Sequence, residues 1–195
     1  MPGVMKLLDT GYVDRDNVAL QGHSWGGYQI AFMVTRTNMF KAAAPGAPVA
    51  NMTSAYGAIR LETGLGRQFQ YERTQSRLGA SLWEVPVRYL ENSPLFWLDK
   101  VETPLLIMHN DQDGAVPFQQ GVELFLGLRR LGKPAWLINY NDEPHWPTTI
   151  ANKRDWNIRM QQFFDHYLKG AAAPAWLQTG IPATQKGRTL DLIMQ

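Results

Sequence analysis

Short, continuously apolar runs alternate along the chain with segments whose apolar residues recur at helical spacing. Runs without polar alternation are typical of strands that are buried on both faces. Four of them have strand length, at residues 18–21, 41–44, 105–109 and 135–140. Helical spacing is found at residues 4–8, 25–36, 122–131 and 156–167, and three of these helices are expected to end at Gly11, Gly132 and Gly170. The pattern predicts an α/β fold in which a mostly parallel sheet is flanked by helices.

The length of 195 residues suits one domain with a full-sized core. We expect residues 1–169 to form a single α/β unit. Within it, residues 51–100 are polar and aromatic and contain no strand-like run. Residues 170–195 are rich in Ala and Pro and are expected to form an irregular C-terminal tail.

Residues with acyl-transfer chemistry follow the expected strands. Ser24 comes after the first strand, Asp111 and Asp113 come after the third, and His145 comes after the fourth. Because the carboxyl ends of parallel strands meet at one edge of the sheet, these side chains are expected to converge there. The stretch Gly22–Gly26 fits the G-x-S-x-G pattern of a nucleophile elbow, and the chain order Ser, Asp, His is that of α/β-hydrolases.

The expected chemistry explains these residue types. A serine hydroxyl is a weak nucleophile, so Ser24 needs His145 as a general base and an aspartate to fix the tautomer of the imidazole. The backbone N–H of Trp25 would be one donor of the oxyanion hole. Glycines flank Ser24 because side chains are expected to clash at such a strained turn.

Other interpretations exist for each residue taken alone. A G-x-S-x-G stretch also arises by chance, Asp111 and Asp113 fit ordinary turns, and His145 fits a loop. His109 is expected to be a core or turn histidine. A metal cluster of these histidines and aspartates is disfavoured because no ligand pair has the helical spacing of a zinc peptidase. Taken together, a serine, an aspartate and a histidine that each follow a strand, in the chain order of α/β-hydrolases, favour a catalytic site.

The composition argues against several other functional classes, namely nucleic-acid-binding, disulfide-bonded and membrane-spanning proteins. The net charge is only +2 and no basic cluster is present, so we expect no nucleic-acid partner. The chain has no Cys, which excludes disulfides, thiolate chemistry and cysteine metal sites. No apolar run is long enough for a membrane helix, and no membrane partner is expected. The first residues lack a signal-peptide pattern, which leaves both a cytoplasmic and an exported location open.

Three longer stretches carry a resemblance to a known family. GHSWGGY, SPLFWLDKVETPLLIMHNDQDGAVPFQQ and NYNDEPHWPTTIANKRDWNIRMQQFFDHYLKG resemble the C-terminal α/β-hydrolase domain of the prolyl oligopeptidase family of serine peptidases. The dipeptidyl-peptidase and acylaminoacyl-peptidase branches are the most similar. The resemblance implies Ser24 as nucleophile and His145 as base. It also favours Asp113 over Asp111 as the acid, because the family's acid precedes a short step to a valine.

The resemblance also implies a pocket for the side chain before the cleaved bond. Its lining would include Val49, Tyr56 and Val116, with Tyr28 or Trp97 nearby. Such an apolar, aromatic pocket suits proline, alanine or another uncharged residue. Ordinary core packing is an equally good interpretation of each of these residues taken singly.

The chain departs from the family in what it lacks. Only four core strands are expected, so residues 1–169 correspond to the C-terminal part of the catalytic domain. By comparison with the family, the first strands of the sheet, the upstream loop that supplies a second oxyanion donor, the N-terminal β-propeller and a glutamate pair that binds a substrate amine are not expected within these 195 residues, which fits a fragment of a longer peptidase. A sheet of this kind leaves the edge near the first strand exposed, which favours a homo-oligomer that covers it.

The expected function is a serine hydrolase that works through a Ser-Asp-His triad and an acyl-enzyme, and is a serine-type peptidase by resemblance. The alternatives are a small carboxylesterase acting on short acyl esters, and a weakly active or non-catalytic fragment that serves as a binding module. The expected partner is a peptide or ester substrate. Neither a cofactor nor a metal ion is implied.

Overall fold

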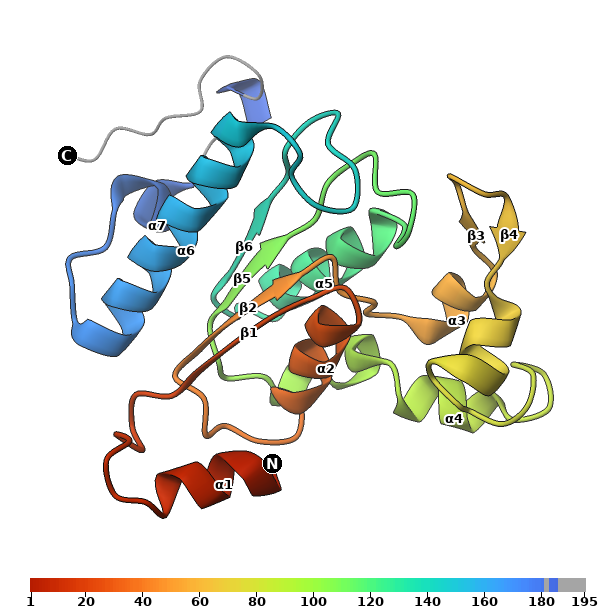
Figure 1. The fold of residues 1–195 in the computed structure, drawn as a ribbon, viewed down its shortest axis with the longest axis horizontal. Coiled ribbons are helices and arrows are strands. Elements are labelled where there is room, and N and C mark those ends of the chain that lie inside the picture. The colour runs from red at the N-terminus through yellow and green to blue at the C-terminus, as the bar shows by residue number, and fades with distance from the viewer. Residues whose placement is uncertain (181–182, 186–195) are drawn as a thin grey trace.

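The computed structural model describes residues 1–180 and 183–185. Helices and strands alternate through most of this part of the chain, as Figure 1 shows from red to blue. The elements, in chain order, are α1 (Pro2–Leu8), β1 (Ala19–His23), α2 (Trp25–Met33), β2 (Ala42–Gly46), α3 (Met52–Tyr56), β3 (Ile59–Arg60), β4 (Leu65–Gly66), a π-helical segment (Gln70–Thr74), α4 (Pro86–Glu91), a 3-10 segment (Pro94–Lys100), β5 (Leu105–Met108), α5 (Gln119–Arg130), β6 (Ala135–Ile138), α6 (Ile150–Lys169), α7 (Ala175–Thr179) and a 3-10 turn (Ala183–Gln185).

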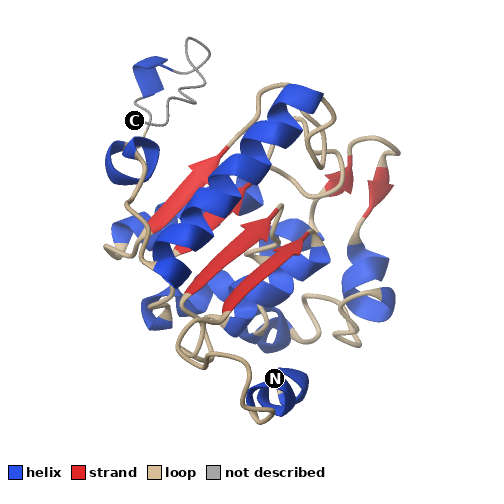
Figure 2. Cartoon of the chain, turned by 60° about the vertical axis from the view of Figure 1, so that its left-hand side comes forward, coloured by secondary structure: helices blue, strands red, loops and turns tan. Residues whose placement is uncertain are grey.

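The main sheet has four strands in the order β1-β2-β5-β6, and every neighbouring pair is parallel. Figure 2 shows these strands running in the same direction. One row of partners crosses three strands, from Ala43 through Leu105 to Ala135. The expected α/β architecture with a parallel sheet is therefore confirmed, and each of its four strands overlaps a predicted apolar run.

The two faces of the sheet are covered by different helices. Alternate residues of the strands point to opposite faces, so Leu105 and Ile107 pack with α2 and α5, whereas Leu106 packs with Phe163 of α6. Figure 1 shows α6 and α7 on one side of the sheet and α2 and α5 on the other. All four residues of β5 are buried, which explains its unbroken apolar sequence.

The segment between β2 and β5 leaves the sheet and builds a cluster of its own. Tyr56, Tyr71 and Tyr89 are buried together there, beside Val49 and Val116. The sequence predicts no strand in this segment, but β3 and β4 form a small antiparallel hairpin. Strands of two residues carry no period-2 pattern, and this is why the sequence does not show them.

The end of α2 and the start of α6 differ from the predicted boundaries. Helix α2 ends at Met33 rather than Arg36, because the chain continues as a turn in which the N–H of Arg36 donates to the Met33 carbonyl at 2.8 Å. Helix α6 begins at Ile150, one and a half turns before its first apolar contact residue. It ends, as predicted, before Gly170, which has a φ of 70°.

The segment 170–195 is not irregular throughout. Its part within the described residues contains α7, whose Trp176 and Leu177 are buried against the sheet side that α6 covers. The indole N–H of Trp136 in β6 donates to the Leu177 carbonyl at 3.0 Å, which fixes α7 to the sheet. Residues 181–182 and 186–195 of the expected tail lie outside the described residues. Among the helices that the structure describes, none is long and apolar enough to cross a membrane.

Candidate active site

Ser24 occupies a strained turn between the last residue of β1 and the first residue of α2. Its φ of 59° and ψ of −117° are unfavourable for any residue with a side chain. The N–H of Ser24 donates to the carbonyl of Gly46 at the end of β2, at 2.8 Å, and this bond holds the turn against the sheet. A serine in this conformation is typical of a nucleophile elbow.

Only one of the two glycines that flank Ser24 is required to avoid a steric clash. A Cβ on Gly22 would lie 2.8 Å from Ile30 Cδ1 and 2.9 Å from the backbone of Gly26, as expected for a flanking glycine. A Cβ on Gly26 would meet nothing within 4 Å, so the expected clash at that position is wrong. The close approach instead occurs at Gly27, where a Cβ would lie 2.3 Å from the carbonyl oxygen of Gly46. Gly27 thus lets α2 pack directly on β2.

Asp113 lies in the loop after β5 and makes hydrogen bonds through both carboxylate oxygens. Its Oδ1 accepts the N–H groups of Ala115 and Val116 at 2.8 and 2.7 Å. Its Oδ2 lies 2.7 Å from Nδ1 of His145 and 3.2 Å from Nε2 of His109. Burial by itself raises the pKa of this carboxyl, but the hydrogen bonds from His109, His145 and Val116 outweigh it and hold the pKa well below its usual range. Asp113 is therefore a buried carboxylate that orients the ring of His145.

Asp111 has a different position and different partners. Its N–H donates to the side chain of Asn139 at 3.1 Å, and its Oδ1 accepts the N–H of Asp142 at 2.8 Å. These bonds tie the loops after β5 and β6 together. The structure thus brings Asp113, and not Asp111, to His145.

His109 is fully buried, as expected for a core histidine, but it also contacts the Asp113 carboxylate. Its Nε2 lies 3.0 Å from the Val116 carbonyl oxygen. A Cβ on Gly121 of α5 would lie 2.5 Å from Nδ1 of this ring, so the glycine provides the space for it. His109 fixes the turn that carries Asp113 and Val116.

The loop that carries His145 is anchored by the buried carboxylate of Glu143. This carboxylate accepts hydrogen bonds from the backbone N–H groups and the hydroxyl groups of Thr148 and Thr149, and from the amide of Asn152. Burial raises the pKa of Glu143, and these donors outweigh that effect and lower it. The bonds join the loop to the first turn of α6.

Asn110 joins the same loop to the end of β5. Its amide N–H donates to the Pro144 carbonyl at 2.8 Å, and its Oδ1 accepts the N–H of Tyr140 at 3.2 Å. His145 is thereby held between two fixed segments.

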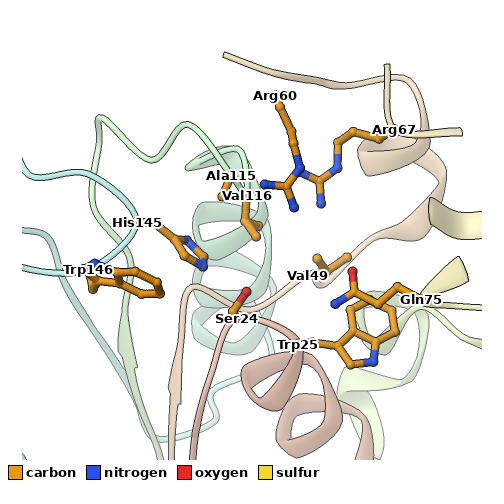
Figure 3. Close-up of a pocket in the computed structure, with 10 residues that line it drawn as sticks. All are labelled: Ser24, Trp25, Val49, Arg60, Arg67, Gln75, Ala115, Val116, His145 and Trp146. Carbon is orange, nitrogen blue, oxygen red and sulfur yellow. The ribbon is translucent and has the colours of Figure 1, made fainter. Parts of the chain in front are cut away.

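Ser24 and His145 line the same pocket, which has a volume of about 250 Å³. Figure 3 shows the imidazole of His145 beside the Ser24 hydroxyl. Among the described residues, no hydrogen bond joins Ser24 Oγ to His145. Such bonds are often long without substrate and tighten in the complex.

Two aromatic neighbours restrict the ring of His145. His23 meets it edge-on with 4.7 Å between ring centroids, and Trp146 lies at 5.1 Å. Burial, reinforced by the charge of His145, lowers the pKa of His23 to about 4. His23 is therefore neutral near pH 7.

Trp25 is the first residue of α2, so its N–H has no acceptor within the helix. Helix N-termini carry a partial positive charge and attract anions. The expected role of Trp25 as one oxyanion donor therefore stays a prediction, with its N–H placed at the start of α2.

The pocket lining agrees only in part with the sequence prediction. Val49 and Val116 line the pocket, as expected, whereas Tyr28, Tyr56 and Trp97 are not among its lining residues. The full lining consists of Ser24, Trp25, Val49, Arg60, Arg67, Gln75, Ala115, Val116, His145 and Trp146.

The three excluded aromatic residues have structural contacts instead. Tyr28 is buried behind Trp25, with ring centroids 4.5 Å apart. The hydroxyl of Tyr56 donates to Glu72 at 2.6 Å. The indole N–H of Trp97 donates to the Glu91 carbonyl, on the part of the chain near α4. These residues support the wall of the pocket or lie away from it.

Five lining residues were not predicted from the sequence: Arg60, Arg67, Gln75, Ala115 and Trp146. The first three are polar and correct the expectation of an apolar, aromatic pocket. They come from the segment between β2 and β5, where no periodic pattern places a residue near Ser24. Ala115 and Trp146 could have been predicted from the sequence, because Ala115 lies two residues after Asp113 and Trp146 directly follows His145. No group of three or more His, Cys, Asp or Glu side chains within the described ranges is arranged to hold a metal ion.

Comparison with protein families places this site in a known context. The model of the prolyl oligopeptidase family, a peptidase family, matches residues 1–171. The chain belongs to the prolyl oligopeptidase family. The resemblance seen in the three sequence stretches is thereby confirmed, and so is the assignment to a family of serine peptidases.

The relatives span bacteria and mammals. An uncharacterized peptidase of Bacillus subtilis, YuxL, is 31% identical over 173 residues, which cover 85% of this chain and 25% of that protein. Dipeptidyl-peptidase 5 of Porphyromonas endodontalis is 27% identical, over 84% of this chain and 23% of its own. The human acylamino-acid-releasing enzyme is 28% identical, over 78% of this chain and 21% of its own. The chain thus spans about a quarter of the length of these relatives.

Solved structures share the fold. The acylaminoacyl peptidase of Pyrococcus horikoshii superposes with a TM-score of 0.75 at 21% identity, covering 92% of this chain and 29% of that one. A puromycin-hydrolyzing peptidase of Mycobacterium tuberculosis also has a TM-score of 0.75, at 24% identity, covering 85% and 24%. This chain therefore has the fold of part of an α/β-hydrolase catalytic domain.

Proposed function

We propose that the chain is a serine hydrolase that cleaves peptides through an acyl-enzyme on Ser24. The observation that carries the proposal is the 2.7 Å bond between Asp113 and Nδ1 of His145, in a pocket that also contains Ser24 on its strained turn. With Nδ1–H donated to Asp113, the Nε2 atom of His145 is left with a lone pair for the Ser24 proton. Membership of the prolyl oligopeptidase family supports the same assignment.

The proposed reaction has two halves. Ser24 Oγ attacks the carbonyl carbon while His145 Nε2 takes its proton, and the oxyanion that forms accepts the N–H of Trp25. The intermediate collapses, the bond to the leaving amine breaks, and His145 returns the proton to that amine. A water molecule then attacks the acyl-enzyme, His145 takes a proton from it, and the acid leaves as Ser24 regains its hydrogen.

The carboxylate of Asp113 serves this cycle by its charge and its position. It accepts the Nδ1–H of His145 throughout, which stabilises the imidazolium that forms in both halves. His109, Ala115 and Val116 hold the carboxylate in place, so that little reorganisation is needed during the reaction.

An esterase activity is the second candidate. The proposal assigns one oxyanion donor, the N–H of Trp25, whereas α/β-hydrolases use two. Losing one such donor costs on the order of 10²–10³ in turnover. Esters have better leaving groups than amides and tolerate this loss better, so short acyl esters are the substrates most suited to a site of this kind.

The test is reaction with a fluorophosphonate, followed by hydrolysis of a p-nitrophenyl ester and of an Ala anilide. Labelling at Ser24 and turnover of both substrates are expected, and Ser24→Ala should abolish both. Turnover of the ester alone would replace the peptidase proposal by the esterase. A folded protein that is neither labelled nor active would overturn both and leave a binding module.

A further inference from the structure

The pocket contains a buried cation without a counter-ion. Arg67 is only 3% exposed, and its buried Nε and Nη1 atoms have no hydrogen-bond acceptor in good geometry, although its charge acts on the Tyr71 hydroxyl and partly offsets the rise in that group's pKa that burial causes. The Arg67 Cζ atom lies 5.9 Å from the centre of the Tyr71 ring, so the guanidinium rests against an aromatic wall. Burying a charged group without partners is unfavourable, and such groups are normally paired.

A second cation faces the same cavity. Arg60 of β3 lines the pocket together with Arg67, and Figure 3 shows both guanidinium groups turned into it. Within the described residues, neither arginine forms an ion pair, and no Asp or Glu lines the pocket. Two unpaired guanidinium groups that face one cavity repel each other, so an anion bound there would relieve both the repulsion and the desolvation. The planar guanidinium suits a carboxylate, which it binds through two parallel hydrogen bonds.

The position of the pair relative to Ser24 indicates which part of a substrate it meets. His145 must face the leaving group, because it protonates that group as the bond breaks. In Figure 3, His145 lies beside Trp146 on one side of Ser24, whereas the guanidinium groups of Arg60 and Arg67 lie across the pocket from Trp146, above Val49 and on the side of Val116. A group bound between the arginines therefore belongs to the acyl part of the substrate. The volume of about 250 Å³ admits one side chain of moderate size.

We propose that Arg60 and Arg67 form a carboxylate-binding subsite, which makes the site selective for an acidic residue before the scissile bond. The proposal rests on the proposed function, because it places the carboxylate on the acyl group that Ser24 receives. Gln75 and Val49 complete the wall around the side chain, and the guanidinium groups bind its charged end.

The first test compares substrates that differ only in charge. The anilides of N-acetyl-Glu and N-acetyl-Gln are hydrolysed by the wild type, Arg60→Met, Arg67→Met and the exposed control Arg130→Met. The wild type and the control should prefer Glu at least about tenfold in kcat/KM, and both pocket variants should lose that preference. Equal rates for Glu and Gln in the wild type would overturn the proposal. An equal loss for both substrates in Arg60→Met and Arg67→Met would also overturn it, since this would assign the arginines to oxyanion stabilisation.

A second pair of substrates distinguishes the two sources of a carboxylate. Peptides with a free C-terminal carboxyl on the leaving side are compared with their C-terminal amides, with Ala before the scissile bond. Similar rates are expected. A preference confined to the free carboxyl would overturn the assignment to the acyl side and make the pair a subsite for the chain end.

Binding without turnover separates this proposal from the proposed function. Titration calorimetry on Ser24→Ala uses N-acetyl-glutamate α-amide and N-acetyl-glutamine α-amide, which differ only in the side-chain carboxylate. Tighter binding of the glutamate compound, lost in the double variant with Arg60→Met, supports the subsite even if the protein proves inactive. Arg60 is partly exposed, so this variant keeps the test decisive where Arg67→Met fails to fold. Equal binding of the two compounds, in a protein that hydrolyses esters, would overturn the subsite alone.

Discussion

Asp113 Oδ2 lies 2.7 Å from His145 Nδ1, and the other oxygen of the same carboxylate accepts two backbone N–H groups. Because all its bonds favour the charged form, Asp113 is expected to stay ionised throughout the pH range in which a neutral His145 can act as a base. The proposed reaction depends on this pairing.

Exchange of Asp113 for Asn tests the pairing directly. Asp113→Asn retains the shape but presents the wrong group to Nδ1, so the imidazole adopts the wrong tautomer. We expect kcat to fall by about 10³–10⁴-fold for any substrate that the chain hydrolyses. Asp111→Asn is the matched control, because its carboxylate only joins two loops, and it should retain most of the activity. A loss of similar size in both variants would contradict the assignment of Asp113.

Two adjacent glycines of α2 should respond in opposite directions to the same substitution. Gly27→Ala places a Cβ 2.3 Å from the Gly46 carbonyl oxygen and should lower the free energy of unfolding by about 1–3 kcal/mol. Gly26→Ala meets no atom within 4 Å and should be neutral or stabilising by up to about 1 kcal/mol. Urea unfolding followed by circular dichroism measures both. A Gly27→Ala protein as stable as the wild type would show that α2 and β2 are less closely packed than described.

The buried ring of His23 should make stability depend on pH. Its pKa is about 4 in the folded chain and near the ordinary value of 6.5 in the unfolded chain. Between these values the unfolded chain binds a proton that the folded chain does not, so the free energy of unfolding decreases as the pH falls from about 6.5 to about 4. Urea unfolding at several pH values in this window should show a shallower dependence for His23→Gln. An unchanged dependence in the variant would mean that His23 is already protonated in the folded protein.

Strand β1 should mediate self-association. Within the part of the chain that the structure describes, it pairs with β2 alone, and its residues are half-buried or exposed, whereas every residue of β2 is buried. Open strand edges invite pairing with another chain. We expect light scattering after size exclusion to show a homodimer or a larger oligomer at micromolar concentration.

A charge placed on this edge provides the control for self-association. Gln21→Lys, at the exposed position of β1, should shift the population toward the monomer. Gln161→Lys, on the exposed side of α6, should not. A wild-type chain that is monomeric and well folded would refute the expectation.

The sheet and the pair Asp113–His145 were within reach of the sequence for the same physical reason. A strand buried on both faces, such as β5, must be apolar throughout, and a polar side chain directly after it therefore marks the edge of the sheet. Asp111 and Asp113 lie in the loop that follows β5, and His145 lies in the loop that follows β6. The choice between Asp111 and Asp113 came from the family resemblance, and the structure agrees with it, because only Asp113 bonds to His145.

Arg60 and Arg67 could not be found in this way. Arg60 belongs to β3 and Arg67 directly follows β4, and the strands of this hairpin have two residues each, too few for any periodicity. Their approach to Ser24 depends on how Tyr56, Tyr71 and Tyr89 pack into a cluster. Such tertiary contacts join residues that are far apart in the sequence, so the spacing of apolar residues along the chain does not predict them.

The separate cluster that supports the hairpin has a consequence for how this molecule can change. The proposed nucleophile, base and acid stand on loops of the sheet, whereas Arg60, Arg67 and Gln75 belong to an excursion with its own aromatic core. The hydrogen bonds of Asp113 to His145, Ala115 and Val116 involve no residue of that excursion, which meets the Asp113 loop through the bond from the N–H of Leu61 to the Gly114 carbonyl. Substrate specificity can therefore change independently of the proposed catalytic residues. A different segment between β2 and β5 would leave Ser24, Asp113 and His145 in place and would select a different substrate side chain.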